Sequence, residues 1–246
     1  MKTLRTSVLL CAMTFSGGLF AQSYPLQEAS STSDPLFEEG FLELPVPMQI
    51  EADISHQVVR YFIDFSCEFC KGLRDVMATW GQTLPEDYTL VYQHVGSMQS
   101  PMYFLKAGTL TYVMNSELTR NQKQDFIDLM FTHVQKVHNE KQQMRLIKEA
   151  VAKVGLPFEP LAQYLMSQEA IDDYQAEVEL QNSIHVKFTP SILIGGKYLT
   201  HLGMTDGRPE KWIELINKIT SIDIYSRANT LATIPNTTLQ ALPPSK

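Results

Sequence analysis

The sequence predicts an α/β fold in which a block of helices is inserted between two parts of one sheet-containing unit. Three observations predict it. Residues 57–94 hold a strand pattern, a helix pattern and a second strand pattern, which is the order of a right-handed βαβ unit. Residues 101–184 then have apolar side chains at helical spacing. Two short β runs and a last amphipathic helix complete the unit.

The first part of the unit is expected at residues 51–100. Its opening run, "QVVRYFIDF", alternates too little for a strand with one wet face, so we expect a central strand covered on both faces. Ser66 and Cys67 stand where the next helix could be capped, Gly81 and Pro85 end that helix, and "YTLVYQHVG" is a second strand. The apolar residues expected on one face of the helix are Phe69, Leu73, Val76, Met77 and Trp80.

The helical insertion is expected at residues 101–184, and the second part of the unit at residues 185–221. The segment "VKFTPSILIGGKYLTHLG" contains two short β runs joined at Gly195 and Gly196, which is a two-residue hairpin signal. The segment "TDGRPEKWIELINKIT" has the spacing of an amphipathic helix. It is expected to close the fold.

Both ends of the chain have a different character. Residues 1–21 combine two basic residues, an apolar run and small residues, as in a secretory signal peptide, with cleavage expected after Ala21 and an uncleaved anchor as the alternative. Residues 22–50 are rich in serine, proline and acidic residues and are expected to form an extended lead-in. Residues 222–246 are polar, contain several prolines and have no periodicity, so we expect a flexible tail.

Charge and cysteine content narrow the function. The formal net charge of −7 argues against nucleic acid as a partner, because such binding needs a basic surface. Removal of a signal peptide would also remove Cys11 and leave Cys67 and Cys70 as the only cysteines. An exported protein would then keep all its thiols in one short pair.

The "CEFC" pair has three candidate roles: a structural disulfide, half of a zinc site, or a redox couple. A disulfide that closes so short a loop constrains the unfolded chain little. A structural zinc site needs four ligands, and no second pair at zinc-finger spacing accompanies Cys67 and Cys70. At the first turn of a helix, unpaired N–H groups and the positive end of the dipole would lower the pKa of Cys67 below its free value of about 8.5. Cys70, one turn later and facing inward, would then attack the mixed disulfide formed at Cys67.

A second motif, "KFTPSILI", places Pro190 directly before a strand. Only an X-Pro bond adopts the cis form at a cost as small as about 0.5–1 kcal/mol. A cis bond between Thr189 and Pro190 would aim the Thr189 main chain at an incoming peptide, which could pair with it as an added strand.

The order of strand, Cys-x-x-Cys helix, strand, helical block, Thr-Pro strand, hairpin and terminal helix resembles the thioredoxin fold. With the helical insertion in this place, residues 50–220 are similar to the DsbA-like family of periplasmic thiol:disulfide interchange proteins. The resemblance implies that Cys67 is the exposed nucleophile, Cys70 the buried resolving thiol, Pro190 the cis-proline and Thr189 the residue before it. It also implies exported cysteine-containing substrates, a redox partner in the membrane, and a redox-active disulfide in place of a metal or nucleotide cofactor. The oligomeric state is not predicted.

The sequence departs from the family at two places. Strongly oxidising members have Pro-His between the cysteines, whereas this chain has Glu68 and Phe69. Neither can stabilise a thiolate as a protonated histidine does, so we expect a couple less oxidising than DsbA at about −120 mV and nearer thioredoxin at about −270 mV. The buried acid that the fold often carries six residues before the first cysteine is Tyr61 here, and Asp64 lies in the other register.

One alternative of another class uses the same thiols. Cys67 and Cys70 could hold copper or zinc in a metal-binding or chaperone-like binding module. Net oxidant, reductase and isomerase also stay open within the redox class. His94, in the second strand, is expected to be a satisfied strand histidine.

Overall fold

The computed structural model of the chain describes residues 40–44, 57–133, 137 and 139–233. The expected signal peptide at 1–21 lies outside these residues, as do most of the lead-in and the end of the expected tail. One five-stranded sheet runs in the order β1-β5-β4-β2-β3, in which β2 and β3 are parallel and the other neighbours antiparallel. The strands are β1 (Leu42–Glu43), β2 (Gln57–Ile63), β3 (Tyr88–His94), β4 (Ser191–Ile194) and β5 (Tyr198–His201).

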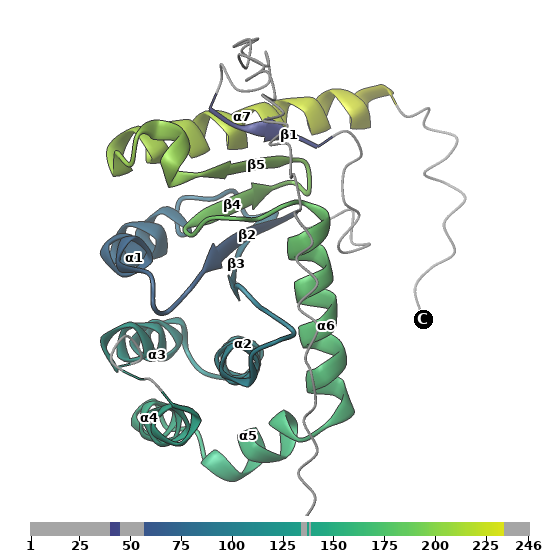
Figure 1. Ribbon diagram of the computed structural model, residues 1–246. Coiled ribbons are helices and arrows are strands. Elements are labelled where there is room, and N and C mark those ends of the chain that lie inside the picture. The colour runs from purple at the N-terminus through teal and green to yellow at the C-terminus, as the bar shows by residue number, and fades with distance from the viewer. Residues whose placement is uncertain (1–39, 45–56, 134–136, 138, 234–246) are drawn as a thin grey trace, which may run out of the picture. The chain divides into compact units, whose positions relative to one another are not determined.

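The helices follow the predicted order, and a helical insertion separates β3 from β4. Helix α1 connects the two parallel strands, and the long helix α7 follows the β4–β5 hairpin (Figure 1). The bounds are α1 (Glu68–Trp80), α2 (Pro101–Met114), α3 (Arg120–His133), α4 (Glu140–Lys153), α5 (Phe158–Leu165), α6 (Gln168–Ser183), η2 (Leu202–Thr205) and α7 (Pro209–Thr233).

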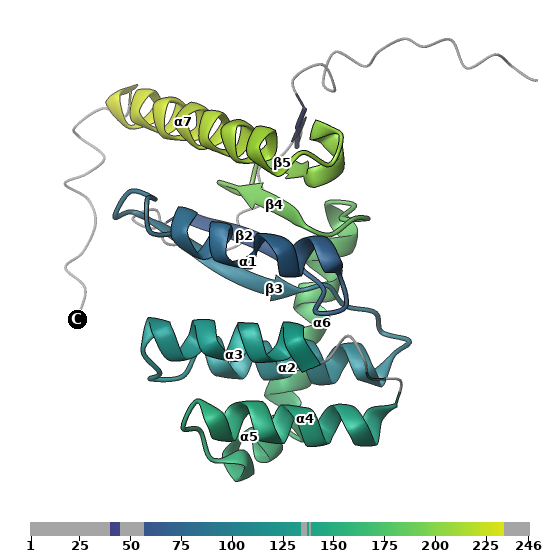
Figure 2. The same cartoon turned by 90° about the vertical axis from the view of Figure 1, so that its left-hand side faces the viewer.

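Strand β2 is central and covered on both faces, as predicted. Its side chains alternate: Tyr61 packs in the large core cluster beside Trp212 of α7, whereas Phe62 packs in a second cluster with Leu193. Figures 1 and 2 show the helices that cover these faces, with α1 and α7 on one side of the sheet and α6 on the other. Burial on both sides explains why the strand shows no polar alternation.

The helical insertion shares its core with the sheet. The large cluster joins side chains of β2 to those of α3 and α4, among them Phe126, Met130 and Ile147. Phe65, just after β2, packs edge-on against Phe131 with ring centroids 5.1 Å apart. The insertion therefore fixes the end of β2, where α1 begins.

The hairpin between β4 and β5 turns at the predicted glycines. Gly195 and Gly196 have φ of +59° and +66°, a region open to glycine, and the Lys197 N–H donates to the Ile194 carbonyl over 3.0 Å. A Cβ atom on Gly195 would also collide with the Asp223 carboxylate. The loop has three residues, 195–197, which is one more than predicted, and β5 begins at Tyr198.

The lead-in at 22–50 is in part a strand of the sheet. Leu42 and Glu43 pair with Leu199 and Tyr198 at the edge of β5, and Lys197 Nζ lies 2.8 Å from Glu43 Oε1. Two residues are too few for a β pattern in the sequence. Residues 42–43 form a strand because their main chain pairs with the edge of β5, which is far away in sequence.

The expected flexible tail at 222–246 is wrong for residues 222–233, which continue α7 without a break. This stretch is tied to the start of β3. Tyr88 Oη donates to Asp223 Oδ2 over 2.6 Å, and Arg227 Nη1 lies 3.6 Å from Asp87 Oδ2. Polar contacts between distant residues hold the helix here, so apolar periodicity could not predict it.

We expect Tyr88→Phe to lower the free energy of unfolding by about 1–3 kcal/mol, because it leaves the buried Asp223 carboxyl without its tyrosine donor. Urea unfolding followed by circular dichroism measures this. Tyr225→Phe is the matched control, because Tyr225 lies on the same helix and is 71% exposed. Equal stability of the two variants would show that this hydrogen bond does not anchor α7.

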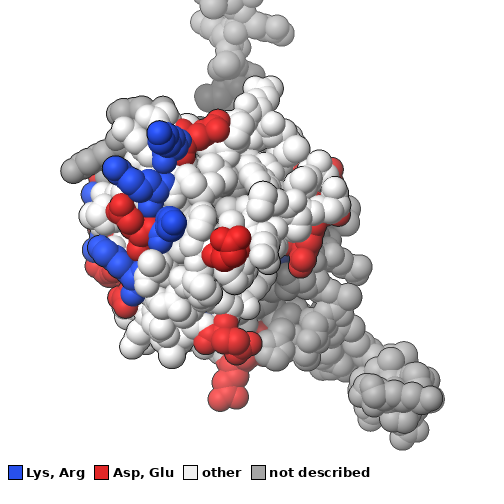
Figure 3. Space-filling view, turned by 90° about the horizontal axis from the view of Figure 1, so that it is seen from below, with Lys and Arg blue, Asp and Glu red and all other residues white. Residues whose placement is uncertain are grey.

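Charge on the surface is mixed. On the face seen in Figure 3, basic side chains gather toward one edge, with acidic side chains among them and across the rest of the face. On helix α4, Arg145 Nε lies 3.8 Å from Glu149 Oε1, one turn further along. No helix in the described part of the chain combines the length and apolar character needed to cross a membrane.

Candidate active site

Cys67 caps the N-terminus of α1. It has extended φ and ψ of −85° and 118°, and its sulfur accepts a hydrogen bond from the Cys70 N–H over 3.4 Å. This is the capping position that the sequence predicted. The sulfur thus faces the amide groups of the first helical turn, which have no partner within the helix.

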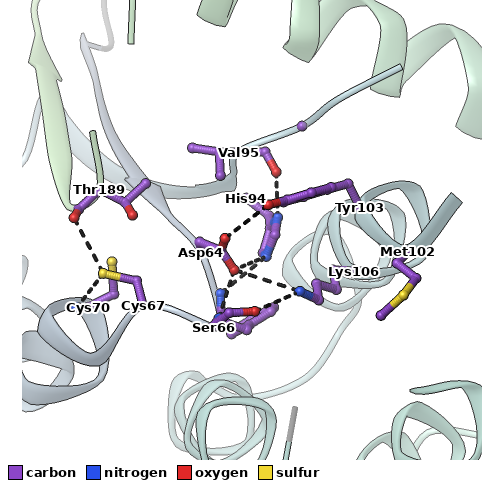
Figure 4. Close-up of polar contacts among 12 residues, drawn as sticks. Asp64, Ser66, Cys67, Cys70, His94, Val95, Met102, Tyr103, Lys106 and Thr189 are labelled. Atoms are coloured by element: carbon purple, nitrogen blue, oxygen red, sulfur yellow. Dashed lines mark hydrogen bonds and ion pairs between the residues drawn. The ribbon is translucent and has the colours of Figure 1, made fainter. Parts of the chain in front are cut away.

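The second predicted motif meets the first in space. Ser191 pairs with Phe62 near the end of β2, so the preceding peptide lies beside the start of α1. The Thr189–Pro190 bond is cis, as predicted. The Cys67 thiol donates to the Thr189 carbonyl oxygen over 3.3 Å, across 122 residues of sequence (Figure 4).

The two cysteines form no disulfide in this structure, and the pKa values of their thiols are shifted in opposite directions. A hydrogen bond from the Cys70 thiol, supported by Thr189 and by the N–H groups of Cys70 and Phe69, outweighs partial burial and lowers the pKa of Cys67 to about 6. Cys70 is fully buried, and burial together with the neighbouring Cys67 sulfur raises its pKa far above the usual value. The site therefore holds one ionised, accessible sulfur and one protonated, enclosed sulfur.

The two residues between the cysteines lie outside the core. Glu68 is exposed in the first turn of α1, and the Phe69 side chain is 62% exposed. The expected apolar face was too wide, because Phe69 and Val76 each precede a buried residue and so point about 100° away from it. The residues that α1 buries are Cys70, Leu73, Met77 and Trp80.

Tyr61 occupies the position where the resemblance implies an acid. It is 1% exposed, its ring packs edge-on against Tyr92 at 5.5 Å, and its hydroxyl has no hydrogen-bond partner among the described residues. Burial, then the nearby Cys70 sulfur, raises the pKa of Tyr61 well above its usual value. Tyr61 therefore stays neutral beside Cys70 and offers no carboxylate for proton transfer.

A polar cluster lies behind Cys67 (Figure 4), and the sequence analysis, which named Asp64 and His94 separately, did not predict that Lys106 joins it. Asp64 Oδ1 accepts from the Ser66 N–H over 2.7 Å, and Lys106 Nζ donates to Ser66 Oγ over 2.9 Å. Lys106 Nζ also lies 3.7 Å from Asp64 Oδ1, and Tyr103 Oη donates to Asp64 Oδ2 over 3.4 Å. The available signal was a single lysine inside the apolar helical segment "PMYFLKAGTLTYVM".

Ionisation within this cluster follows from its contacts. Burial opposes the charge of Asp64, but the Ser66 N–H and the Lys106 ammonium stabilise it and hold the pKa of Asp64 well below its usual range. His94 Nε2 lies 3.5 Å from Asp64 Oδ1, but it accepts from the Phe65 N–H and has no proton for the carboxylate. Burial lowers the pKa of Lys106, and the Asp64 charge opposes that effect. Asp64 and Lys106 thus form an ion pair in which each charge stabilises the other against the cost of burial.

His94 is satisfied within the structure, as expected for a strand histidine. Its Nε2 atom accepts from the Phe65 N–H over 3.2 Å, so its Nδ1 atom carries the proton and donates to the Val95 carbonyl over 2.6 Å. Burial lowers the pKa of His94 and keeps the ring neutral. Within the residues that the structure places, no group of three or more His, Cys, Asp and Glu side chains is arranged to hold a metal ion.

The fold is that of known DsbA structures. The chain superimposes on Pseudomonas aeruginosa DsbA with a TM-score of 0.60 at 16% identity, covering 78% of this chain and 94% of that one. The oxidoreductase NmDsbA1 from Neisseria meningitidis gives a TM-score of 0.59 at 16% identity, covering 77% and 94%. Xylella fastidiosa DsbA gives 0.60 at 13% identity, covering 76% and 96%.

Neither a protein-family model nor a curated relative matches the sequence. The likeness to solved structures therefore establishes the fold: a DsbA-like thioredoxin fold with an inserted helical domain, as the sequence predicted.

Proposed function

We propose that this chain, which has a DsbA-like thioredoxin fold, is an exported thiol–disulfide oxidoreductase with Cys67 as the nucleophile and Cys70 as the resolving thiol. One observation carries the proposal: the Cys67 sulfur caps α1 and meets the cis Thr189–Pro190 peptide, whereas Cys70 is fully buried behind it. The difference in pKa between the two thiols supports it. Thiolates attack disulfides and thiols do not. Only Cys67 is ionised and accessible at neutral pH, so it makes the first attack.

The exchange conserves atoms and electrons in two steps. The Cys67 thiolate attacks one sulfur of a substrate disulfide, forms a mixed disulfide and releases the other substrate sulfur as a thiolate. Cys70 then loses its proton and attacks the Cys67 sulfur, which releases the second substrate thiolate. The substrate disulfide is reduced to two thiols after protonation, and Cys67 and Cys70 become a disulfide. The reverse sequence oxidises a substrate.

Substrate contact is proposed at the Thr189–Pro190 peptide. The Thr189 carbonyl reaches the Cys67 sulfur in the reduced protein, so a peptide that pairs with this main chain would bring its own sulfur to the same point. Phe69 lies between the two cysteines and Phe188 lies directly before Thr189. Their side chains are 62% and 59% exposed. Exposed aromatic rings beside the nucleophile suit unfolded chains, whose apolar residues are still accessible.

The cellular setting is part of the proposal. The signal-like residues 1–21 favour export to the periplasm, where disulfides persist. The substrates would be exported proteins with cysteines, and a redox partner in the membrane would restore the working state of the pair. The reaction uses the Cys67–Cys70 disulfide as its redox centre and needs no further cofactor.

Equilibration against glutathione tests the proposal. The thiolate at Cys67 stabilises the reduced form increasingly as the pH rises above about 6, and fully above the usual thiol pKa of about 8.5. At pH 7 about one pKa unit of this stabilisation is present, which makes the couple more oxidising by roughly 30 mV. We therefore expect a potential between about −270 and −120 mV. Phe69→His should raise it by tens of mV, because a protonated imidazole would stabilise the thiolate.

Two results of this experiment would contradict the proposal. One is that no Cys67–Cys70 disulfide forms at any ratio of oxidised to reduced glutathione. The other is a potential below about −300 mV, which is the range of structural disulfides. Val76→His serves as the control for the histidine itself, because Val76 is 43% exposed on α1 and two turns beyond Phe69. It should leave the potential unchanged.

A further inference from the structure

The loop between β2 and α1 is fixed by contacts at every residue. Three successive N–H groups are bonded: Phe65 to His94 Nε2 over 3.2 Å, Ser66 to Asp64 Oδ1 over 2.7 Å, and Cys67 to the Asp64 carbonyl over 2.8 Å. Asp64 thus holds two of these three groups, one with its side chain and one with its main chain. The nucleophile stands at the end of this fixed segment.

Lys106 reaches the same loop from the helical insertion. It lies on α2, is 5% exposed, and donates from Nζ to Ser66 Oγ over 2.9 Å (Figure 4). Its Nζ atom lies 5.2 Å from the Tyr103 ring centroid and 3.7 Å from Asp64 Oδ1. Ser66 is therefore held twice, by Asp64 at its N–H and by Lys106 at its hydroxyl.

Stability alone does not account for this pair. A buried ion pair is often no more stabilising than apolar side chains of similar volume, because both charges lose their hydration. A methionine at position 106 could fill the same space within the apolar segment of α2. What the lysine adds is a directed hydrogen bond to the residue that precedes the nucleophile.

We infer that Lys106 and Asp64 are positioning residues, which act through Ser66 to hold the Cys67 sulfur over the first turn of α1. The inference rests on the proposed function and deepens it. As a thiolate the Cys67 sulfur accepts from the Cys70 N–H over 3.4 Å, and as a thiol it also donates to the Thr189 carbonyl over 3.3 Å. Hydrogen bonds are directional, so a rotation of the Ser66–Cys67 peptide weakens the contact with the Cys70 N–H.

Loss of Lys106 would act on the thiolate in two ways with the same sign. The Ser66 peptide would lose one of its two anchors, so the sulfur would spend less time against the helix N-terminus. The Asp64 carboxylate would also lose its cationic partner and keep only the Ser66 N–H, the Tyr103 hydroxyl and the neutral His94 ring around it. A negative charge without a counter-ion, three residues before Cys67, disfavours a second one. Both effects raise the pKa of Cys67.

The test compares four forms of the full reduced chain: wild type, Lys106→Met, Ser66→Ala and the double variant. Iodoacetamide alkylation of Cys67 is measured from pH 4 to pH 9. We expect Lys106→Met to move the midpoint upward by at least about half a pH unit, which is a roughly threefold loss of thiolate below the midpoint. Ser66→Ala should cause a smaller shift, and the double variant should not exceed Lys106→Met, because Lys106 acts through Ser66.

Lys148→Met is the matched control. It also removes an ammonium group over an aromatic ring of the insertion, 5.3 Å from the Phe158 centroid, but from an exposed position on α4. Its midpoint should equal that of the wild type. Thermal unfolding of each variant separates positioning from stability, because a purely structural role would change the melting temperature without moving the midpoint.

The outcomes distinguish the inference from the proposed function. A wild-type midpoint near 8.5 would remove the basis of the proposed function itself. A low wild-type midpoint that Lys106→Met leaves unchanged would overturn the inference alone, as would additive shifts in the double variant. If Lys106→Met fails to fold, Ser66→Ala decides the matter, because Ser66 is exposed and its removal leaves the core intact.

Discussion

Cys67→Ser is expected to abolish thiol–disulfide exchange, with a rate loss of roughly a thousandfold or more. A serine hydroxyl is not ionised at neutral pH, and the other sulfur is fully buried and protonated. No second nucleophile at this site can then replace Cys67. Reduction of insulin disulfides by the variant and by the wild type, with dithiothreitol as electron donor, measures the loss. An active Cys67→Ser variant would contradict the assignment of the nucleophile.

Cys70→Ser is the control within the same site. It keeps the Cys67 thiolate and removes the thiol that resolves the mixed disulfide. The variant should attack substrate once and then remain joined to it, which non-reducing gel electrophoresis detects as a higher-mass species that dithiothreitol removes. The serine hydroxyl keeps a hydrogen-bond donor in the place of the Cys70 thiol, which makes the largest contribution to the low pKa of Cys67, so the trapped species should form at neutral pH and more slowly below about pH 6.

The predictable part of this site is local in sequence. A β-branched run followed by a helix pattern placed Cys67 at the cap of α1, and the family resemblance implied the cis-proline at Pro190, which the structure contains. Repeated apolar spacing also predicted the order of strands and helices around them. These features can be predicted because each depends on a pattern of several residues that are close together in the sequence.

The missed features depend on single contacts between distant residues. Lys106 and Ser66 are 40 residues apart, and Tyr88 and Asp223 are 135 apart. Each contact involves one donor and one acceptor, so no periodic pattern accompanies it. The end of α7 and the cluster behind Cys67 therefore became visible only in three dimensions.

The insertion and the nucleophile are linked through both kinds of contact. Phe131 of α3 packs against Phe65, two residues before the nucleophile, and Lys106 of α2 binds Ser66, the residue between them. The helical insertion thus supports the loop that ends at Cys67 as well as covering the sheet.

Alkylation of the native reduced protein should modify one cysteine and not the other. With a pKa of about 6, the Cys67 sulfur is roughly 90% ionised at pH 7, against about 3% for a free thiol. Its rate should be constant above about pH 7 and fall about tenfold for each pH unit below the midpoint. Cys70 is fully buried, and its raised pKa keeps it protonated throughout this range.

Mass spectrometry of the peptides gives the answer. The peptide that contains both Cys67 and Cys70 should carry one alkyl group at pH 7, on Cys67, and a second on Cys70 only after denaturation in urea. The denatured chain is its own control, because both thiols then react with ordinary pKa values near 8.5. Two alkyl groups on this peptide from the native protein, or a first one on Cys70, would mean that helix α1 does not separate the two sulfurs in acidity and access, and the order of attack at this site would have to be reversed or abandoned.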